Sequence, residues 1–248
     1  EKLHIADTIG EQGALYLNGD DPMLQQLRES YTGKIVWYGM ESDCDYRAVN
    51  IDTVKDCTRF ELHAPFGAHK IMIPALGLHN VSNALAAIAV AYDQGLTLDD
   101  IRCGLLTYEG LAMRQQIHEL DKITVIDDSY NASPDSIKSG IGVLMAVKST
   151  GKKIAVLADM LELGERSAQA HLEPGAYAAA SGVDAVVTVG REAEKIAEGA
   201  AEESRKILVK ACGTNDEAFA ELEKILNDGD CVLVKGSRGM HTDEIVQK

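Results

Sequence analysis

Two adjacent carboxylates, Asp127 and Asp128, stand where an apolar run of the sequence ends and a polar loop begins. Residues 123–126, which precede them, are mostly β-branched and are typical of a buried strand. Residues 133–135, Ser-Pro-Asp, supply an N-cap, a proline suited to the first helical turn and an early acid, which predicts a helix start. Ligands bind in α/β proteins where strands end, so the two acids are candidate ligand contacts. The alternative is that they only cap the turn.

Polar side chains follow two later apolar runs as well. Asp159 comes after one of them, and Lys235, Ser237 and Arg238 surround two glycines after the other. Glycine lets the backbone approach an anion closely, and lysine and arginine supply positive charge. If these strands are parallel, their carboxyl ends share one edge of a sheet, so we expect the acids and the cations to converge on one crevice. His171, the histidine nearest to Asp159 in this half of the chain, is interpreted as structural.

Three further polar residues lie outside these loops. Asn80 and Asn83 would share one face of a helix, and their carboxamides offer the donors and acceptors that suit a purine edge. Asn80 could instead be an ordinary helix N-cap. Arg114 follows a change in the character of the chain, and a guanidinium at a hinge can bridge a bound phosphate. The alternative for Arg114 is a surface charge.

The pattern of predicted elements changes near residue 111. Before it, alternating segments at 47–54, 59–64 and 69–73 predict antiparallel strands, and two helices follow, the first ending near residue 93 and the second spanning about 97–106. After it, apolar runs predict strands near 117–120, 123–126, 153–157, 185–189, 207–209 and 231–234. Helices are predicted near 135–147, 167–181, 192–203 and 216–227. Regular alternation indicates parallel βαβ units, so we predict an α/β protein with a doubly wound, mostly parallel sheet in residues 112–248.

Composition excludes several classes of function. The chain has 248 residues and a net charge of −15, which argues against a surface for nucleic acid or anionic lipid, although local cations can still hold a small anion. Its five cysteines form no CxxC pair, so we expect reduced thiols in a cytoplasmic protein without a zinc site. No apolar run is long enough to span a bilayer. The first residue is not methionine, and we expect the chain to be a piece of a longer protein.

Two common nucleotide-binding motifs are missing from the sequence. Gly-Lys occurs at 33–34 and 151–152, but neither pair has the earlier glycine and the following Ser or Thr of a P-loop. No dinucleotide-binding glycine fingerprint follows any predicted strand. The residues taken by themselves therefore indicate a two-domain α/β protein with a polar crevice for an anionic ligand.

Taken in order, five segments resemble the motifs of the Mur ligases, and the match runs nearly end to end. They are residues 77–83, 114–116, 127–134, 156–164 and 233–238. The segment at 127–134 is similar to that of family members that add D-alanyl-D-alanine, with Ser133 where asparagine is usual. Ala158 stands where the family usually has glycine, and His4 where it usually has glutamate.

The resemblance implies an ATP- and Mg²⁺-dependent, ADP-forming ligase of peptidoglycan synthesis. In such an enzyme ATP phosphorylates the terminal carboxylate of UDP-N-acetylmuramoyl-tripeptide, and the amine of D-alanyl-D-alanine attacks the acyl phosphate. It further implies that residues 1–111 are the end of the central ATP-binding domain, without its P-loop, and that residues 112–248 are a Rossmann-like C-terminal domain that binds the amine substrate. The chain by itself is then expected to be inactive. No nucleic-acid partner and no membrane insertion are implied.

The resemblance also implies roles for individual residues. Those on the ATP side are Asn80, Asn83, Arg114 and Asp128. Those on the amine-substrate or nucleotide side are Asp127, Ser129, Tyr130, Asn131, Asp159, Lys235, Ser237 and Arg238. Lys2 falls where the family has a carbamylated, Mg²⁺-bridging lysine. Two alternatives stay open: a related ligase with another amine, such as one resembling folylpolyglutamate synthase, and a noncatalytic module that binds a nucleotide or peptide.

Overall fold

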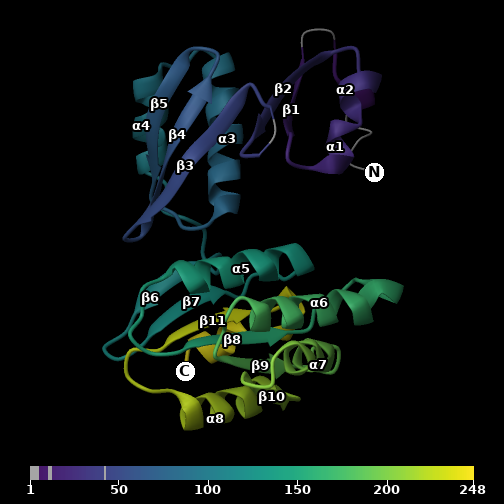
Figure 1. The fold of residues 1–248 in the computed structure, drawn as a ribbon, viewed down its shortest axis with the longest axis vertical. Helices are drawn as coiled ribbons and strands as arrows, with labels where there is room; N and C mark the ends of the chain where they lie inside the picture. The colour runs from purple at the N-terminus through teal and green to yellow at the C-terminus, as the bar shows by residue number, and fades with distance from the viewer. Residues whose placement is uncertain (1–5, 11–12, 42) are drawn as a thin grey trace. The chain divides into compact units, whose positions relative to one another are not determined.

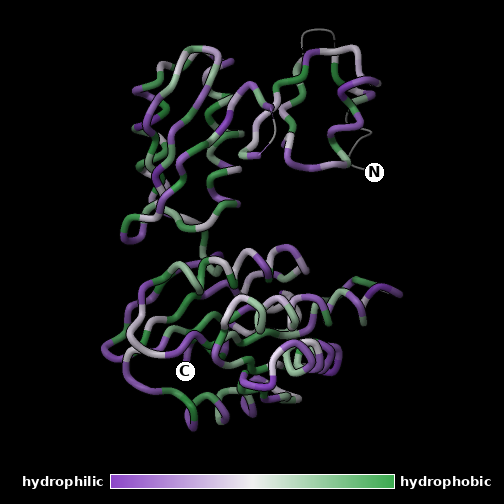
Figure 2. The backbone as a smooth tube through the Cα atoms, viewed as in Figure 1, coloured by the Kyte–Doolittle hydropathy of each residue, from purple (hydrophilic) through white to green (hydrophobic). Residues whose placement is uncertain are grey.

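The computed structural model describes residues 6–10, 13–41 and 43–248, and the chain divides into two compact units. Unit 1 ends at Glu109, and unit 2 begins at Gly110. Hydrophobic residues run through the strands of both sheets, while the turns and outer helix faces are more hydrophilic (Figure 2). Each unit therefore has a core of its own. In the described part of the chain, no helix has the length and apolar character needed to cross a bilayer.

Unit 1 contains a five-stranded sheet in the order β1-β2-β3-β4-β5. The first three strands pair in parallel, and β3, β4 and β5 pair antiparallel, as predicted for this part of the chain. The bounds are β1 (Ala14–Asn18), β2 (Lys34–Gly39), β3 (Tyr46–Val54), β4 (Cys57–Ala64) and β5 (Gly67–Ile73). Two short helices, α1 (Pro22–Gln25) and α2 (Leu27–Ser30), connect β1 to β2.

The core of unit 1 lies between this sheet and α3 (Leu78–Asp93), with α4 (Leu98–Leu106) beside it (Figure 1). Strand β4 alternates as a half-buried strand should: Phe60 and Leu62 are buried, and the residues between and beside them face outward. Helix α3 presents the apolar stripe Val81, Ala84, Leu85 and Ile88, at the spacing of one helical face. Helix α4 begins with a capping box between Thr97 and Asp100, which confirms the helix start predicted at residue 97.

Unit 2 is built on a six-stranded sheet in the order β10-β9-β8-β11-β7-β6. All pairs are parallel except β6 with β7, so the predicted doubly wound, mostly parallel sheet is confirmed. The connection from β6 to β7 is too short for a helical crossover, which is why this pair forms a hairpin instead of a βαβ unit. The bounds are β6 (Gln116–Glu119), β7 (Thr124–Asp128), β8 (Lys153–Ala158), β9 (Ala185–Val189), β10 (Leu208–Cys212) and β11 (Cys231–Lys235).

The chain crosses this sheet in two directions. It passes from β7 through β8 and β9 to the edge strand β10, and then returns to place β11 between β8 and β7. Helices α5 (Pro134–Ala146), α6 (Ser167–Ala180) and α7 (Glu194–Glu203) follow the outward path, and α8 (Asn215–Ile225) and α9 (Asp243–Val246) follow the return. Figure 1 shows α5 and α8 on opposite sides of the sheet. Helix α6, which follows β8, packs with α5, and α9, which follows β11, packs with α8. The chain thus leaves these adjacent strands toward different faces, which is how a doubly wound sheet opens a crevice.

Helices α6 and α7 are packed so tightly that their backbones touch. A Cβ atom on Gly175 would lie 1.9 Å from the carbonyl oxygen of Ile196, and one on Gly199 would lie 2.2 Å from that of Leu172. Pro174 sits inside α6 without ending it. The close approach therefore depends on two glycines, one on each helix.

Candidate functional site

A buried ion pair lies at the carboxyl edge of the unit 2 sheet. The parallel register of β7 and β11 sets Asp128 directly beside Lys235, and Lys235 Nζ lies 2.7 Å from Asp128 Oδ2. The lysine and aspartate side chains are only 3% and 8% exposed. Lys235 Nζ also donates to the carbonyl oxygen of Asn131 at 2.9 Å. The lysine thereby ties the end of β11 to the loop that follows β7.

Burial lowers the pKa of Lys235 below its ordinary value, because the charged ammonium is withdrawn from water. The negative charge of Asp128 and its hydrogen bond oppose this effect, and the positive charge of Arg114 adds to it. Helix α5 packs on the pair through Gly140, where an added Cβ would lie 3.3 Å from Asp128 Oδ2. The pair is therefore enclosed by a helix as well as by its two strands.

The neighbouring acid, Asp127, points to the other face of β7 and has a different role. Its Oδ1 accepts hydrogen bonds from Ser129 N at 3.1 Å and from Ser129 Oγ at 2.5 Å, and both residues are buried. This is the turn-capping arrangement that the sequence left open as an alternative. Asp127 and Ser129 thus shape the loop, while Asp128 faces the lysine.

Arg114 lies over the same loop in the described part of unit 2. Its guanidinium carbon is 4.3 Å from the centre of the Tyr130 ring, and the Tyr130 backbone N–H donates to Met113 O at 3.1 Å. Arg238, from the loop after β11, donates from Nη1 to Met113 Sδ at 3.2 Å. Arg114 and Arg238 are both exposed to solvent, and Arg238 Nη1 also lies 3.9 Å from Asp243 Oδ1. Met113 also has a φ of 61°, a backbone conformation that is uncommon outside glycine.

The predicted site residue Asp159 is engaged within the protein. Its Oδ1 accepts the backbone N–H of Ala193 at 2.6 Å, at the start of α7. Burial raises the pKa of the Asp159 carboxyl, and the Ala193 hydrogen bond partly opposes the rise. A Cβ on Gly190 would lie 2.5 Å from this carboxylate, so only glycine fits there. Asp159 therefore anchors α7 to the end of β8.

The loops after β8 and β11 are joined by Ser237. The Ser237 backbone N–H donates to Asp159 O at 3.2 Å, and Ser237 Oγ accepts the Leu161 N–H at 2.9 Å. Gly236 makes the approach possible, because a Cβ there would lie 2.7 Å from the Cβ of Ala158. The convergence of the three strand-end loops expected from the sequence is thus present: Asp128 meets Lys235, and Asp159 meets Ser237.

The two asparagines lie in unit 1, at the start of α3. Asn80 Nδ2 donates to Leu76 O at 2.8 Å, and Asn83 is exposed one turn further on. The N-cap of α3 is Gly77, so the interpretation of Asn80 as an ordinary N-cap is wrong. Gly77 has a φ of 91° and starts the helix without a side-chain hydrogen bond.

Metal binding has little support in the described residues. Lys2, the candidate Mg²⁺-bridging residue, lies outside them. In the part of the chain that the structure describes, no group of three His, Cys, Asp or Glu side chains is placed to hold a metal ion.

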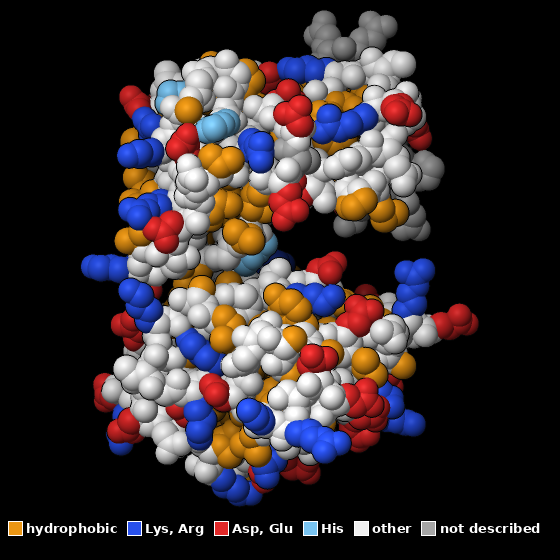
Figure 3. All heavy atoms as spheres, viewed as in Figure 1, with side chains coloured by type: hydrophobic (Ala, Val, Ile, Leu, Met, Phe, Trp, Pro, Cys, Tyr) orange, Lys and Arg blue, Asp and Glu red, His pale blue; other side chains and the backbone are white. Residues whose placement is uncertain are grey.

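On the face shown in Figure 3, positive and negative side chains are interspersed, without a broad basic patch.

His171, interpreted as structural from the sequence, supports this edge through a contact that was not predicted. His171 in α6 is fully buried and accepts the backbone N–H of Met160, the residue after Asp159. The sequence offered no signal for this contact beyond the presence of a histidine near an acidic strand end, because its partner is a backbone group. Asp159, His171 and Ser237 together determine the position of the loop after β8.

Comparisons with known proteins cover both units. A family model described as "Mur ligase, glutamate ligase domain" matches residues 113–238, and one described as "Mur ligase middle domain" matches residues 1–91. The UDP-N-acetylmuramoyl-tripeptide--D-alanyl-D-alanine ligase of Bacillus subtilis (strain 168) is 34% identical over 247 residues, which are 99% of this chain and 53% of the relative. The ligase of the same name from Escherichia coli (strain K12) is 29% identical, over 99% of this chain and 54% of its own length.

Solved structures agree with these matches. A crystal structure of MurF from Acinetobacter baumannii has a TM-score of 0.89 and 31% identity, covering 99% of this chain and 53% of that one. MurF ligase from Thermotoga maritima in complex with ADP has a TM-score of 0.84 and 26% identity, covering 99% of this chain and 55% of that one. The chain spans about half the length of the curated relatives it matches.

Proposed function

Because this chain belongs to the Mur ligase family, we propose that it forms part of an ATP-dependent, ADP-forming ligase that joins D-alanyl-D-alanine to UDP-N-acetylmuramoyl-tripeptide in peptidoglycan synthesis. Residues 1–111 are then the end of the central ATP-binding domain, and residues 112–248 are the C-terminal domain that binds the incoming amine. The observation that carries this function is the buried Asp128–Lys235 pair with two exposed guanidinium groups beside it. In a protein of net charge −15, this local cationic edge suits a phosphorylated ligand.

ATP, when bound, supplies the phosphoryl group that converts the unreactive carboxylate of the tripeptide into an acyl phosphate. The amine nitrogen of D-alanyl-D-alanine then forms a C–N bond to the acyl carbon, the C–O bond to phosphate breaks, and inorganic phosphate leaves. Charge accumulates on the phosphate oxygens during both steps, so the part of the protein that faces them needs fixed positive charge.

Arg114 is the residue of unit 2 best placed to supply that charge. Its guanidinium is exposed and rests on the Tyr130 ring, whose backbone is bonded to Met113. A guanidinium held over an aromatic ring keeps its donors directed outward, where they can bind phosphate oxygens in pairs. Arg238 adds a second exposed cation from the loop after β11.

The other predicted residues of this edge act by holding the loops. Lys235 has two acceptors already, Asp128 and the carbonyl of Asn131, so we assign it to positioning the β7 loop instead of gripping the nucleotide directly. Asn131 also accepts the Ala132 N–H through its side chain, which further orders that loop. Asp127 and Ser129 lock its first turn. On the amine side, Asp159 and Ser237 fix the loop after β8.

Three further proposals rest on the sequence and the resemblance, and not on contacts in the described structure. Asn80 and Asn83 are proposed to contact the adenine side of the nucleotide from unit 1. Lys2 is proposed to act as a carbamate that bridges Mg²⁺, and since the described residues contain no cluster suited to a metal, we assign none of them to Mg²⁺. The 248-residue chain, which contains no P-loop sequence, is proposed to have no turnover by itself.

Amine-dependent ADP release by the whole protein that contains this chain tests the proposed function. The assay supplies ATP, Mg²⁺ and UDP-N-acetylmuramoyl-tripeptide, and compares D-alanyl-D-alanine with single amino acids, with the 248-residue chain run in parallel. Release with the dipeptide only, and by the whole protein only, is the expected result. Release with a different amine would keep a ligase but change its substrate, and no release with any amine would favour a noncatalytic binding module.

Variants of single arginines test whether the candidate site at the carboxyl edge of the unit 2 sheet takes part in the reaction. Arg114→Ala is expected to lower kcat/KM by about 100-fold, since a charge-stabilising donor to phosphate is lost. Arg59→Ala, in an exposed ion pair of unit 1, serves as the control and should leave turnover unchanged. Equal activity of the two variants would argue against a role for Arg114.

A further inference from the structure

We propose that His171 is a positioning residue for the loop after β8, a role that rests on the ligase function proposed above. His171 belongs to α6 and is 0% exposed. Its Nε2 accepts the Met160 backbone N–H at 2.8 Å, and its Nδ1 lies 2.7 Å from Ser167 O. A carbonyl oxygen can only accept, so the ring proton is on Nδ1 and Nε2 is the acceptor.

Ser237, from the loop after β11, binds the residues on either side of Met160. The Asp159 carbonyl accepts the Ser237 N–H at 3.2 Å, and Ser237 Oγ accepts the Leu161 N–H at 2.9 Å. Met160 lies between these two hydrogen bonds, and its own N–H is the one that His171 accepts. His171 and Ser237 therefore hold the same three residues from two different elements, so a shift of Met160 must move the partners of Ser237.

This arrangement connects a fully buried histidine to the proposed amine side of the site. Ser237 lies between Lys235, which is paired with Asp128, and the exposed Arg238. The hydrogen bonds that His171 makes in the described structure go to Met160 and Ser167, so we assign it to the loop and not to a ligand. The geometry gives it one specific task, which is to accept the Met160 N–H.

Two substitutions separate this task from simple filling of space. Gln is long enough to bring its Oε1 near the position of Nε2, so His171→Gln retains an acceptor for Met160. Asn is shorter and brings its side-chain amide near the position of Nδ1, so His171→Asn retains the bond to Ser167 O but leaves the buried Met160 N–H without an acceptor. Leaving a buried donor unpaired costs more than losing one partner of a solvated bond. If His171 only filled space, the shorter and longer amides would not differ in this way.

The hydrogen bond from the Met160 N–H to His171 Nε2 is called the tether below. Amide hydrogen exchange in the 248-residue chain measures it directly. His171→Gln should keep the exchange rate of the Met160 amide within about threefold of the unaltered chain, and His171→Asn should raise it by about tenfold or more. Equal rates at Met160 in the two variants would overturn the tether. In the unaltered chain, an NMR scalar coupling across the hydrogen bond between Met160 ¹⁵N and His171 Nε2 should be observable. Its absence would overturn the tether even if a variant failed to fold.

Kinetics of the whole protein test whether the tether matters for the reaction. His171→Asn is expected to raise KM for D-alanyl-D-alanine by about tenfold with a much smaller change in kcat, and His171→Gln to restore a value within about threefold of wild type. The same KM in both variants, together with normal wild-type turnover, would overturn the positioning role. Failure of the wild-type protein to turn over would instead reject the ligase function, and the coupling and exchange results would still decide whether His171 holds the loop.

Discussion

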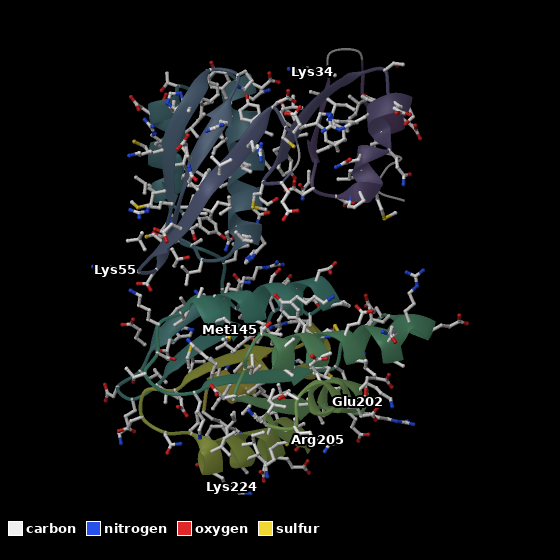
Figure 4. All side chains as sticks on the ribbon, in the orientation of Figure 1. Lys34, Lys55, Met145, Glu202, Arg205 and Lys224 are labelled. Atoms are coloured by element: carbon white, nitrogen blue, oxygen red, sulfur yellow. The ribbon has the colours of Figure 1, made fainter. Side chains whose placement is uncertain are left out.

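Charged side chains are placed differently in the two units. In unit 1, the pair Lys34–Asp93 has exposed fractions of 53% and 33%, and the pair Arg59–Asp52 has 61% and 55%. Lys34 is labelled at the periphery of this unit in Figure 4. Unit 2 has surface pairs as well, such as Lys224 with Glu221, and Lys224 is labelled at the outer border of this unit in the same view. What unit 2 adds, among the ion pairs that the structure describes, is the Asp128–Lys235 pair, which is almost fully enclosed.

The two kinds of ion pair differ in how far their charges are withdrawn from water. An exposed pair contributes about 0–1 kcal/mol, because water solvates both partners almost as well when they are apart. A buried pair has lost that solvation, so removing one partner leaves an uncompensated charge in the interior. Burial of the pair at a shared strand edge, and not the number of charges, therefore distinguishes unit 2 among the described ion pairs.

Lys235→Met is expected to have the largest effect on stability. It leaves the Asp128 carboxylate buried without the lysine, which costs about 3–5 kcal/mol. Arg59→Met, which breaks an exposed pair of unit 1, should cost about 0–1 kcal/mol. Denaturant unfolding measures both losses, and hydrogen exchange in β11 and in β4 shows which unit is affected.

A double variant sharpens this comparison. Asp128→Asn combined with Lys235→Met should recover a large part of the lost stability, because no unpaired charge stays buried. A loss for Lys235→Met no greater than that for Arg59→Met would remove the contrast between the units.

Gly236→Ala is expected to have the second largest effect. The new methyl would lie 2.7 Å from Ala158 Cβ and 2.9 Å from Thr242 Cγ2, and such overpacking costs about 1–3 kcal/mol. Gly104→Ala in α4 of unit 1 is the matched control, since no atom lies within 4 Å of its added Cβ and alanine favours a helix. Thermal unfolding should show a lower melting temperature for the first variant and an equal or higher one for the second.

Adding Ala158→Gly to Gly236→Ala should restore part of the loss, because one of the two close contacts is relieved. The contact with Thr242 would persist, so recovery should be incomplete. Full tolerance of Gly236→Ala alone would contradict the close approach of the β8 and β11 loops.

Asp159→Asn and Asp93→Asn should change the pH dependence of stability with opposite signs. Burial raises the pKa of Asp159, so just above its ordinary value of 3.8 the native state binds more protons than the unfolded state, and its contribution falls as pH rises. The pKa of Asp93 is lowered by hydrogen bonds from Lys34 and Tyr16, so its contribution is lost as pH falls through the region below 3.8. Asparagine removes either dependence.

Denaturant unfolding between about pH 3 and pH 6 measures the stability of each variant and of the unaltered chain as a function of pH. The Asp159→Asn chain should gain stability relative to the unaltered chain as pH rises from 3.8. The Asp93→Asn chain should differ most from the unaltered chain at the upper end of the range. If the stability of both variants relative to the unaltered chain changed in the same direction as pH rises, the assignment of one acid as buried and the other as solvated would be contradicted.

The smallest effect is expected for the pKa of Tyr16 in unit 1. This pKa can be measured in the folded protein without any change in stability. Burial and the hydrogen bond to Asp93 raise the Tyr16 pKa to about 12. Asp93→Asn should lower that pKa without restoring the ordinary value, because burial persists. Tyrosinate absorbance measures the shift, with Tyr16→Phe identifying the signal. Tyr38, whose pKa is raised by burial alone, should titrate as before.

Local pattern was sufficient for most of the fold. The apolar runs and the capping residues at Thr97 and Ser133 predicted the strands and helix starts of both units, because those signals are contained in a few consecutive residues. The antiparallel pair of β6 and β7 is compatible with the mostly parallel sheet predicted for unit 2. The expectation that strand ends converge also followed from alternation alone, since parallel strands share an edge.

The identity of the contacts at that edge was beyond local pattern. Asp127 and Asp128 are the same residue type side by side, and only the register of β7 against β11 decides which of them meets Lys235. Asp159 and His171 bond to backbone N–H groups of Ala193 and Met160, which leave no trace in residue types. The ligand-binding roles of these residues stay predictions.

The backbone contact between α6 and α7 has a consequence for which residues are retained during evolution. Gly175 and Gly199 touch no proposed ligand, yet even a methyl group at either position would press against a main-chain carbonyl. Helix α6 carries His171 and the start of α7 holds the Asp159 carboxylate, so separating the two helices would disturb the β8 loop at two of its three supports. A lineage that keeps this loop in place is thus expected to retain both glycines, and a mutational scan would score them as severely as residues of the site itself.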